Sequence, residues 1–222
     1  MADAKALLEK IRQDLQPVTE QLLRHPYVLA LEEGKIGRES MCLFAGEQQH
    51  IIASDLKSVA HLVNRFGSAP SRDFFLGILQ GEKAAWDALL SFAHALGLDE
   101  TQLREHEPLP GAHAYTCYMA WLALYASDAE VAGAYLVNFP AWGENCGRLS
   151  RILTERFSLG EKDVAFFDLF ASPPATFEAD ALSVIQKGLD RGTEPRLIQR
   201  AARLLQAYEV MYWDTLYSSS SP

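Results

Sequence analysis

Glu47 and His50 are the first residues along the chain whose types and spacing could do chemistry together. They stand three positions apart in "FAGEQQHI", so on a helix they share a face, where a carboxylate and an imidazole can converge on one ligand or proton. Leu43 and Ile52 place apolar bulk beside the pair. The alternative interpretation is a solvated surface pair, because polar residues are usually exposed.

A second carboxylate, Glu209, stands among aromatic residues in "AYEVMYWDTLY", close to Tyr212 and Trp213. An ionised carboxylate in such surroundings needs a partner or acquires a raised pKa. The pattern therefore favours a tuned acid or base. A glutamate that points outward from an aromatic packing stripe would give the same spacing, so both interpretations stay open.

The segment "YLVNFPAWGENCGRL" combines a proline with several reactive or polar residues. Asn138 and Trp142 follow one another at helical spacing, and Glu144 lies on an adjacent face. Pro140 is predicted to bend the helix that contains it. Cys146 is the one cysteine near these residues, but nucleophilic catalysis requires a thiolate beside a base or positive field, and a buried inert thiol is the preferred interpretation.

Metal binding has little support in the sequence. Helical bundles build di-iron sites from inward carboxylates and two Glu-x-x-His pairs, whereas only Glu47 and His50 form such a pair on an expected core face. A single histidine is also a poor ligand set for iron or zinc. We therefore expect no metal and no cofactor.

The elements that must position these residues are predicted to be helices throughout. Apolar residues recur with helical spacing along the whole chain, and no run of alternating strand residues appears. Ser127 and Glu130 have the spacing of a capping box, which predicts a helix start at that point. The expected helical regions are 4–33 with breaks at Pro17 and Pro26, 38–66, 72–96, 115–126, a helix from 127 onward, 164–170, a helix ending near 189, and one from Pro195 to 217.

The composition of the chain indicates which classes of protein it can belong to. The chain has 222 residues, 49% of them hydrophobic, which suits one helical domain over 1–217 with 218–222 as a flexible tail. A formal charge of −9 disfavours nucleic-acid binding. No 18-residue apolar run suggests a membrane span, and three cysteines without a CxxC pair indicate a reducing compartment, by default the cytoplasm.

Three groups of segments, in order, resemble the TenA family of thiaminase II-like proteins. They are "HPYVLALEEGKI" with "FAGEQQHI", then "AYTCYMAWLA" with "GAYLVNFPAWGENCGRL", and finally "AYEVMYWDTLY". The resemblance spans nearly the whole chain and implies the haem-oxygenase-like fold, a single-domain bundle of seven or more helices shared with PqqC-type enzymes. It also implies a pocket for an aminopyrimidine and metal-free hydrolysis of thiamin or of a thiamin breakdown product.

Carried over position by position, the resemblance keeps some functional residues and alters others. Tyr115 matches a pocket tyrosine, and Glu209 matches the glutamate that serves as acid and base. Glu47 falls where the family has an aspartate that holds the pyrimidine, and His50 falls where it has a tyrosine. Trp142 and Glu144 resemble the family's downstream aromatic and acidic positions.

The family's nucleophilic cysteine, in a segment of the form LLPCxW, has no counterpart in "LVNFPAW". Its place falls on Asn138, Phe139 or Ala141, none of which can attack a ring carbon. A branch of the family without this cysteine relies on glutamates, so an enzyme remains the leading hypothesis.

The leading hypothesis is a cysteine-independent hydrolase of an aminopyrimidine or related small heteroaromatic amine. Glu209 would be the acid and base, and Glu47 with His50 would orient substrate or water. The expected substrate contacts are Tyr115, Asn138, Trp142, Glu144 and Tyr212.

Two further classes are kept. One is a non-catalytic small-molecule-binding or regulatory protein. The other is an oxidoreductase, either PqqC-like and cofactor-free or a mononuclear-metal enzyme that uses Glu47, His50, Glu209 and Glu144. The aromatic stretch "MYWDTLY" and the resemblance together predict a homodimer or homotetramer.

Overall fold

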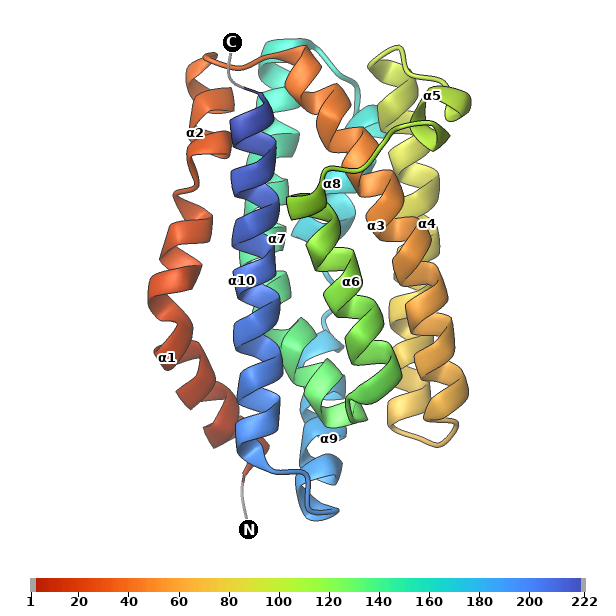
Figure 1. The fold of residues 1–222 in the computed structure, drawn as a ribbon, viewed down its shortest axis with the longest axis vertical. Coiled ribbons are helices and arrows are strands. Elements are labelled where there is room, and N and C mark those ends of the chain that lie inside the picture. Colours follow the sequence, from red (N-terminus) through yellow and green to blue (C-terminus); the bar gives the residue numbers. More distant parts are fainter. Residues whose placement is uncertain (1–2, 221–222) are drawn as a thin grey trace.

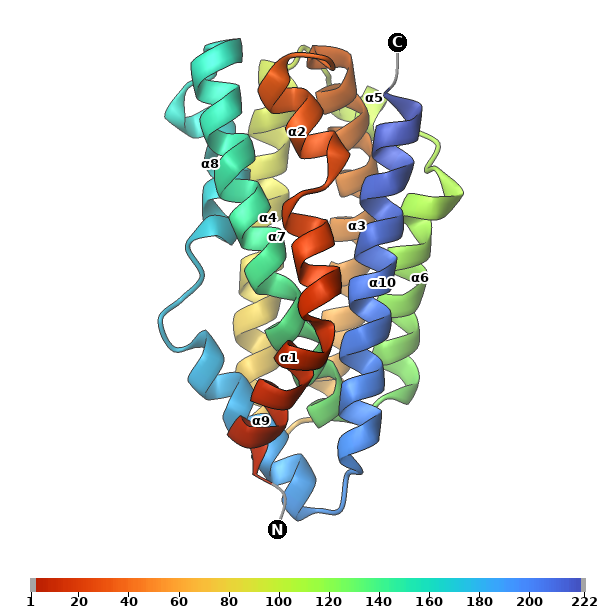
Figure 2. The ribbon, with the colours of Figure 1, turned by 90° about the vertical axis from the view of Figure 1, so that its left-hand side faces the viewer.

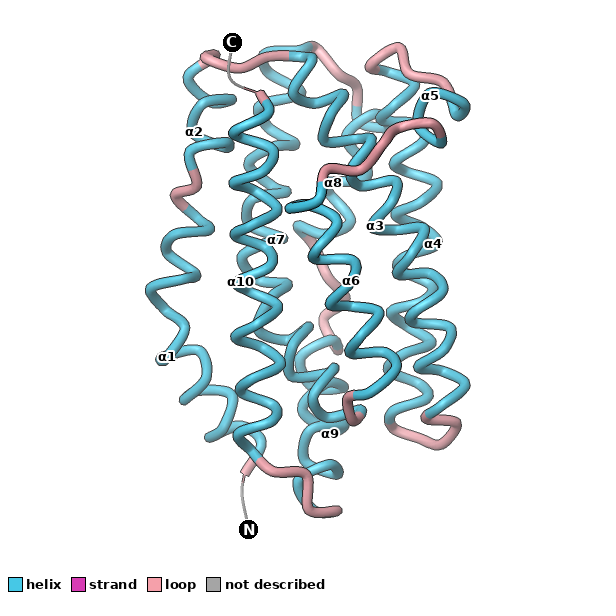
Figure 3. The backbone as a smooth tube through the Cα atoms, viewed as in Figure 1, coloured by secondary structure: helices cyan, strands magenta, loops and turns pink. Residues whose placement is uncertain are grey.

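Ten α-helices account for nearly all of residues 3–220, the part of the chain that the computed structural model describes. Within this range no residue lies in a β-strand (Figure 3). The helices are α1 (Ala4–Leu23), α2 (Pro26–Glu33), α3 (Arg38–Arg65), α4 (Ser71–Ala95), α5 (Glu100–Arg104), α6 (Pro110–Tyr125), α7 (Asp128–Phe157), α8 (Glu161–Ala171), α9 (Phe177–Asp190) and α10 (Pro195–Ser219). The predicted all-α class with seven or more helices is confirmed.

Local signals set several helix ends. The predicted capping box is present at the start of α7, where the Ser127 backbone N–H donates to the Glu130 carboxylate at 2.9 Å and the Glu130 N–H donates to Ser127 Oγ at 3.3 Å. Pro195 begins α10, where its missing N–H leaves no intrahelical bond unmade. Gly34 ends α2 with φ 74°, a left-handed conformation that glycine adopts without steric cost.

Three predicted boundaries are wrong in detail. Pro17 does not interrupt α1, which packs against α7 and α10 and so gains helix stability from tertiary contacts. Pro110 begins α6, five residues before the predicted start at Tyr115. The last helix continues to Ser219, so residues 218 and 219 belong to it rather than to a tail, and residues 221–222 lie outside the described part.

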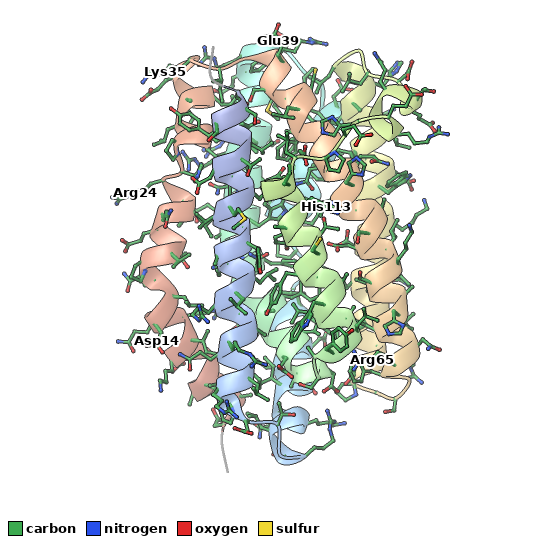
Figure 4. The ribbon with its side chains drawn as sticks, in the orientation of Figure 1. Asp14, Arg24, Lys35, Glu39, Arg65 and His113 are labelled. Carbon is green, nitrogen blue, oxygen red and sulfur yellow. The ribbon has the colours of Figure 1, made fainter. Side chains whose placement is uncertain are left out.

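The helices run mainly along the long axis of the molecule, with α10 between α1 and α6 (Figure 1). α7 packs against α10 and also contacts α8 and α9, while α3 packs between α4 and α6. The charged residues labelled at the outer surface in Figure 4, such as Asp14, Arg24 and Glu39, are exposed. No helix in residues 3–220 is long and apolar enough to cross a membrane.

The hydrophobic core consists of two clusters that meet in the middle of the bundle. One includes Phe44, Ile52 and Tyr212 from α3 and α10, and the other includes Tyr118 and Tyr135 from α6 and α7. Side chains from both clusters line a single internal cavity. The polar side chains that line this cavity therefore lie at the junction between two packed regions.

Candidate active site

Glu209 is the polar centre of this cavity. It lies on α10, is 2% exposed, and accepts hydrogen bonds from Asn138 Nδ2 on α7 at 2.5 Å and from Trp213 Nε1 at 3.1 Å. Burial raises the pKa of Glu209 to about 7, although the two donors act in the opposite direction. At neutral pH both its protonated and ionised forms are therefore populated, as acid–base catalysis requires.

Asn138 is held in place by its other hydrogen bonds. The Tyr115 hydroxyl donates to Asn138 Oδ1 at 3.2 Å, and the Asn138 amide also reaches Gln206 Oε1 at 3.3 Å. Burial raises the pKa of the Tyr115 phenol well above its ordinary value, so this hydroxyl stays protonated and remains a donor. The orientation of the amide toward Glu209 is thus fixed from two sides.

Asp55 on α3 and Glu82 on α4 bring two more buried carboxyl groups to the cavity, 5% and 7% exposed. Burial raises the pKa of Glu82 to about 7, and burial together with the charge of Glu82 raises the pKa of Asp55 well above its usual range. Asp55 Oδ1 is buried without a hydrogen-bond partner, and so is the hydroxyl of Tyr135. Such groups are costly unless a ligand or water satisfies them.

The cavity is lined by both polar and aromatic side chains, and it has a volume of ≈ 40 Å³. That is room for about three water molecules. Its lining consists of Gln48, Ile51, Ile52, Asp55, Glu82, Tyr115, Tyr135, Asn138, Phe139, Trp142, Phe170, Glu209 and Tyr212. Three of these are carboxyl residues and none is lysine, arginine or histidine, so the lining is complementary to a ligand that donates hydrogen bonds or carries a positive charge.

Five of the sequence-predicted site residues are brought together at the cavity: Tyr115, Asn138, Trp142, Glu209 and Tyr212. Tyr212 accepts a hydrogen bond from Gln48 Nε2 at 2.8 Å. The ring of Trp142 lies 5.4 Å from that of Trp213 and 6.0 Å from that of Tyr212.

Glu47 and His50 do not line the cavity, contrary to the expectation that they face substrate or water. Glu47 Oε1 accepts hydrogen bonds from His106 Nε2 at 2.8 Å and from the Leu109 N–H at 2.9 Å. His50 Nε2 donates to the His106 carbonyl at 2.6 Å. Both side chains hold the connection between α5 and α6.

Glu144 is also displaced from its expected place. It is exposed and lies beside Pro140 on the outer side of α7. Because Glu144 is six positions beyond Asn138, it faces about 120° away from it on an α-helix with 3.6 residues per turn. The substrate contact predicted for Glu144 is therefore not supported by its position.

Sequence reasoning missed Asp55, Glu82 and Tyr135. Gln48, Ile52 and Asp55 have the i, i+4, i+7 spacing of one helix face, and that face points to the cavity. This spacing is visible in the sequence. It begins one residue after Glu47, however, and successive residues of an α-helix point about 100° apart.

The metal-ligand set considered from the sequence is not assembled. Glu144 is exposed, Glu47 and His50 bind the α5–α6 connection, and only Glu209 lines the cavity. Among the residues described, no three side chains of His, Cys, Asp or Glu are grouped so that they could hold a metal ion.

Cys146 is fully buried and lies outside the cavity lining. Burial, followed by the charges of Glu209 and Asp168, raises the pKa of its thiol well above the ordinary value. A thiol of this kind is a poor nucleophile. Of the three counterparts of the family cysteine, Asn138 and Phe139 line the cavity and Ala141 does not.

Comparison with known proteins adds a family match. The sequence model of the TENA/THI-4/PQQC family matches residues 12–219. No protein with a curated description matches the chain.

Solved structures share the fold at low sequence identity. A TenA homologue from Pseudomonas syringae pv. tomato is 14% identical with a TM-score of 0.81, covering 95% of this chain and 92% of that one. A putative TenA-like thiaminase from Sulfolobus solfataricus is 12% identical with a TM-score of 0.67, covering 99% and 98%. Haem oxygenase-1 from the cyanobacterium Synechocystis, solved with haem, is 15% identical with a TM-score of 0.69, covering 96% and 93%. The fold is thus haem-oxygenase-like.

Proposed function

Because the chain belongs to the TENA/THI-4/PQQC family, we propose that it is a cysteine-independent hydrolase of an aminopyrimidine or a related small heteroaromatic amine, with a role similar to thiamin salvage. The observation that carries this proposal is Glu209, a buried carboxyl with a pKa of about 7 that lines an internal cavity beside Asn138. A carboxyl tuned toward neutral pH can both take up and deliver a proton.

The proposed reaction replaces the amino group of the ring by a hydroxyl group taken from water. Ionised Glu209 takes a proton from a water molecule while the water oxygen forms a bond to the ring carbon that carries the amino group, and the electron pair of the adjacent ring C=N double bond moves onto the ring nitrogen. Protonated Glu209 then gives that proton to the amino nitrogen as the exocyclic carbon–nitrogen bond breaks with its electron pair on the leaving nitrogen, and the pair on the ring nitrogen re-forms the C=N bond. The ring amine and water become the hydroxylated ring and ammonia, and Glu209 returns to its starting state.

The remaining cavity residues supply binding. Tyr115 and Trp142 offer aromatic faces on which a flat ring can stack. Asp55 Oδ1 and the Tyr135 hydroxyl, which have no hydrogen-bond partner among residues 3–220, can hydrogen-bond to ring substituents or water. Asn138, one of the three residues at which the place of the family's nucleophile falls, serves as a hydrogen-bond donor to Glu209.

Glu47 and His50 take a different role from the one expected of them. They fix the α5–α6 connection through His106 and Leu109. That connection leads directly into α6, which carries Tyr115. We therefore assign Glu47 and His50 as positioning residues rather than groups that touch substrate.

The compartment is proposed from the cysteines. Cys42, Cys117 and Cys146 are all free thiols, which suits a reducing environment such as the cytoplasm.

The proposal is tested by incubating the purified protein with a panel of aminopyrimidines, including 4-aminopyrimidine, and measuring ammonia release together with the mass of the ring product. We expect ammonia and a ring product heavier by one mass unit. A compound that raises the melting temperature but is recovered unchanged after long incubation would instead support a non-catalytic binding protein.

A further inference from the structure

We propose that the substrate carries an apolar substituent, which occupies a groove between α4 and the α8–α9 connection that adjoins the cavity. This inference rests on the function proposed above and extends it to the class of substrate. The groove has a volume of ≈ 320 Å³ and includes Gly77 and Gly81 of α4, Leu169 of α8, and Pro173 in the connection. Figure 2 shows this connection as an extended segment at the edge of the bundle.

The cavity and the groove adjoin each other at shared lining residues. Glu82, Phe139 and Phe170 line both the cavity and the groove. The two phenylalanines are only half-buried, and they are the apolar side chains shared by the two spaces. A change of rotamer at Phe139 or Phe170 would therefore join the two spaces, with Glu82 at the junction.

The cavity alone is smaller than a usual ligand pocket, whereas the groove is not. Ligand pockets usually measure about 300–1,000 Å³, whereas the cavity alone measures ≈ 40 Å³. The groove, at ≈ 320 Å³, lies within that range. A ring held near Glu209 consequently has to extend toward the groove, and any substituent on that side enters it.

The walls of the groove present apolar side chains. Ile78, Leu169 and Phe177 present apolar surface, and the Leu169 side chain is 44% exposed although it is a large hydrophobic residue. An exposed apolar wall next to a polar cavity matches a substrate with an apolar extension.

The charged residues along the cavity and the groove narrow the class of substrate further. The ionisable residues along the groove are Asp73, Asp180 and Glu82, and those along the cavity are Asp55, Glu82 and Glu209. Among the residues that the structure describes, none that lines either space is basic, so a fatty acid or other anionic amphiphile is disfavoured. The occupant is therefore a neutral or cationic amine with an alkyl or aryl extension.

The two groove glycines allow a clean test. A Cβ atom added at Gly77 or Gly81 meets no heavy atom within 4 Å, so a side chain can begin at either position without a clash. Gly81→Leu is expected to fill the groove, while Gly81→Ala adds one methyl group and leaves it open. Ala84→Leu is the matched control, because Ala84 is exposed on the same helix and does not line the groove.

The experiment measures dissociation constants by calorimetry for 4-aminopyrimidines that carry n-alkyl chains of one, three or five carbons, and for n-alkylamines of the same lengths. In the wild type we expect affinity to rise about fourfold for each methylene that is buried. In Gly81→Leu this dependence on chain length should disappear while the short-chain compounds bind as before. Ala84→Leu should behave like the wild type, and Gly81→Ala, which adds one methyl group to the groove, should keep a dependence on chain length.

The outcomes separate this inference from the proposed function. If 4-aminopyrimidine binds but longer chains add no affinity, the groove assignment is overturned and the proposed function stands. If only the alkylamines bind, with a length dependence that Gly81→Leu removes, the groove assignment is supported and the ring assignment fails. If Gly81→Leu changes only the oligomeric state, a second copy of the chain occupies the groove and the inference is wrong.

Discussion

Asn138 Nδ2 lies 2.5 Å from Glu209 Oε2 and donates a hydrogen bond to it across the interface between α7 and α10. This contact favours the ionised form of Glu209 and so opposes the effect of burial on its pKa. Asn138 is one of the three residues at which the place of the family's nucleophile falls. Its side chain is positioned to tune a proton-transfer group.

The first prediction concerns that contact. Asn138→Ala removes one of two donors to Glu209, so the pKa of Glu209 should rise above about 7. The acid limb of the pH profile of kcat/KM should move to higher pH by the same amount. An unchanged acid limb would show that Asn138 does not tune Glu209.

The second prediction concerns stability. Burial raises the pKa of Glu209 from 4.5 to about 7, so the folded protein binds this proton more tightly than the unfolded chain does. The resulting stabilisation is fully present below pH 4.5 and is lost as pH rises through about 7, a change of about 3 kcal/mol in the free energy of unfolding.

Urea unfolding at pH 5 and pH 8 measures this effect. Glu209→Gln cannot ionise, so its stability should fall less between these two pH values than that of the wild type. Glu144→Gln is the control, because Glu144 is exposed and should leave the wild-type pH dependence intact. Equal pH dependence in the wild type and Glu209→Gln would contradict the assigned pKa.

The third prediction separates positioning from catalysis. Glu47→Ala leaves His106 Nε2 and the Leu109 N–H without their acceptor, which should destabilise the protein by about 1–3 kcal/mol. Glu47→Gln keeps an acceptor oxygen and should lose less. Neither variant should shift the pH profile of kcat/KM, and a shift would place Glu47 among the groups that act on substrate.

The fourth prediction concerns self-association as a homodimer or homotetramer. The stretch "MYWDTLY" was expected to supply aromatic surface, but Tyr212 and Trp213 are buried in the core at 2% and 0% exposure. Among the described residues, the two most exposed large apolar side chains are on α6, where Leu124 is 53% and Tyr125 is 70% exposed, whereas Met211 in this stretch is 44% exposed. Exposed apolar patches often mark interfaces.

Light scattering coupled to gel filtration tests this assignment. We expect a homo-oligomer for the wild type and a smaller species for Leu124→Glu. Gln21→Glu, at another exposed position, is the control because it adds the same single negative charge. A wild-type monomer, or a Leu124→Glu variant of unchanged mass, would contradict an interface on α6.

The fold was largely predictable because its signals are local. The capping box at Ser127 and the first-turn proline at Pro195 are written in neighbouring residues, and both appear at the expected helix starts. Pro17 was misread because packing against α7 and α10 outweighs the local cost of a proline, which no short stretch of sequence reveals.

The cavity was predictable only in part. Glu209 and Asn138 are predicted from local residue patterns and Tyr115 from the family resemblance, and all three line the cavity. Asp55 and Glu82 meet there because α3 packs against α4, a contact between distant segments that periodicity cannot supply. The spacing of Glu47 and His50 indicates a chemical pair, but Glu47 lies one residue before the face of α3 that lines the cavity.

The most direct test of the central claim compares kcat/KM for ammonia release in two variants. Glu209→Gln removes the proposed acid and base and should lower kcat/KM by roughly 10²–10⁴-fold, whereas Cys146→Ala removes the buried thiol and should leave it near the wild-type value. Full activity in Glu209→Gln, or a comparable loss in Cys146→Ala with the fold intact, would contradict glutamate-based hydrolysis.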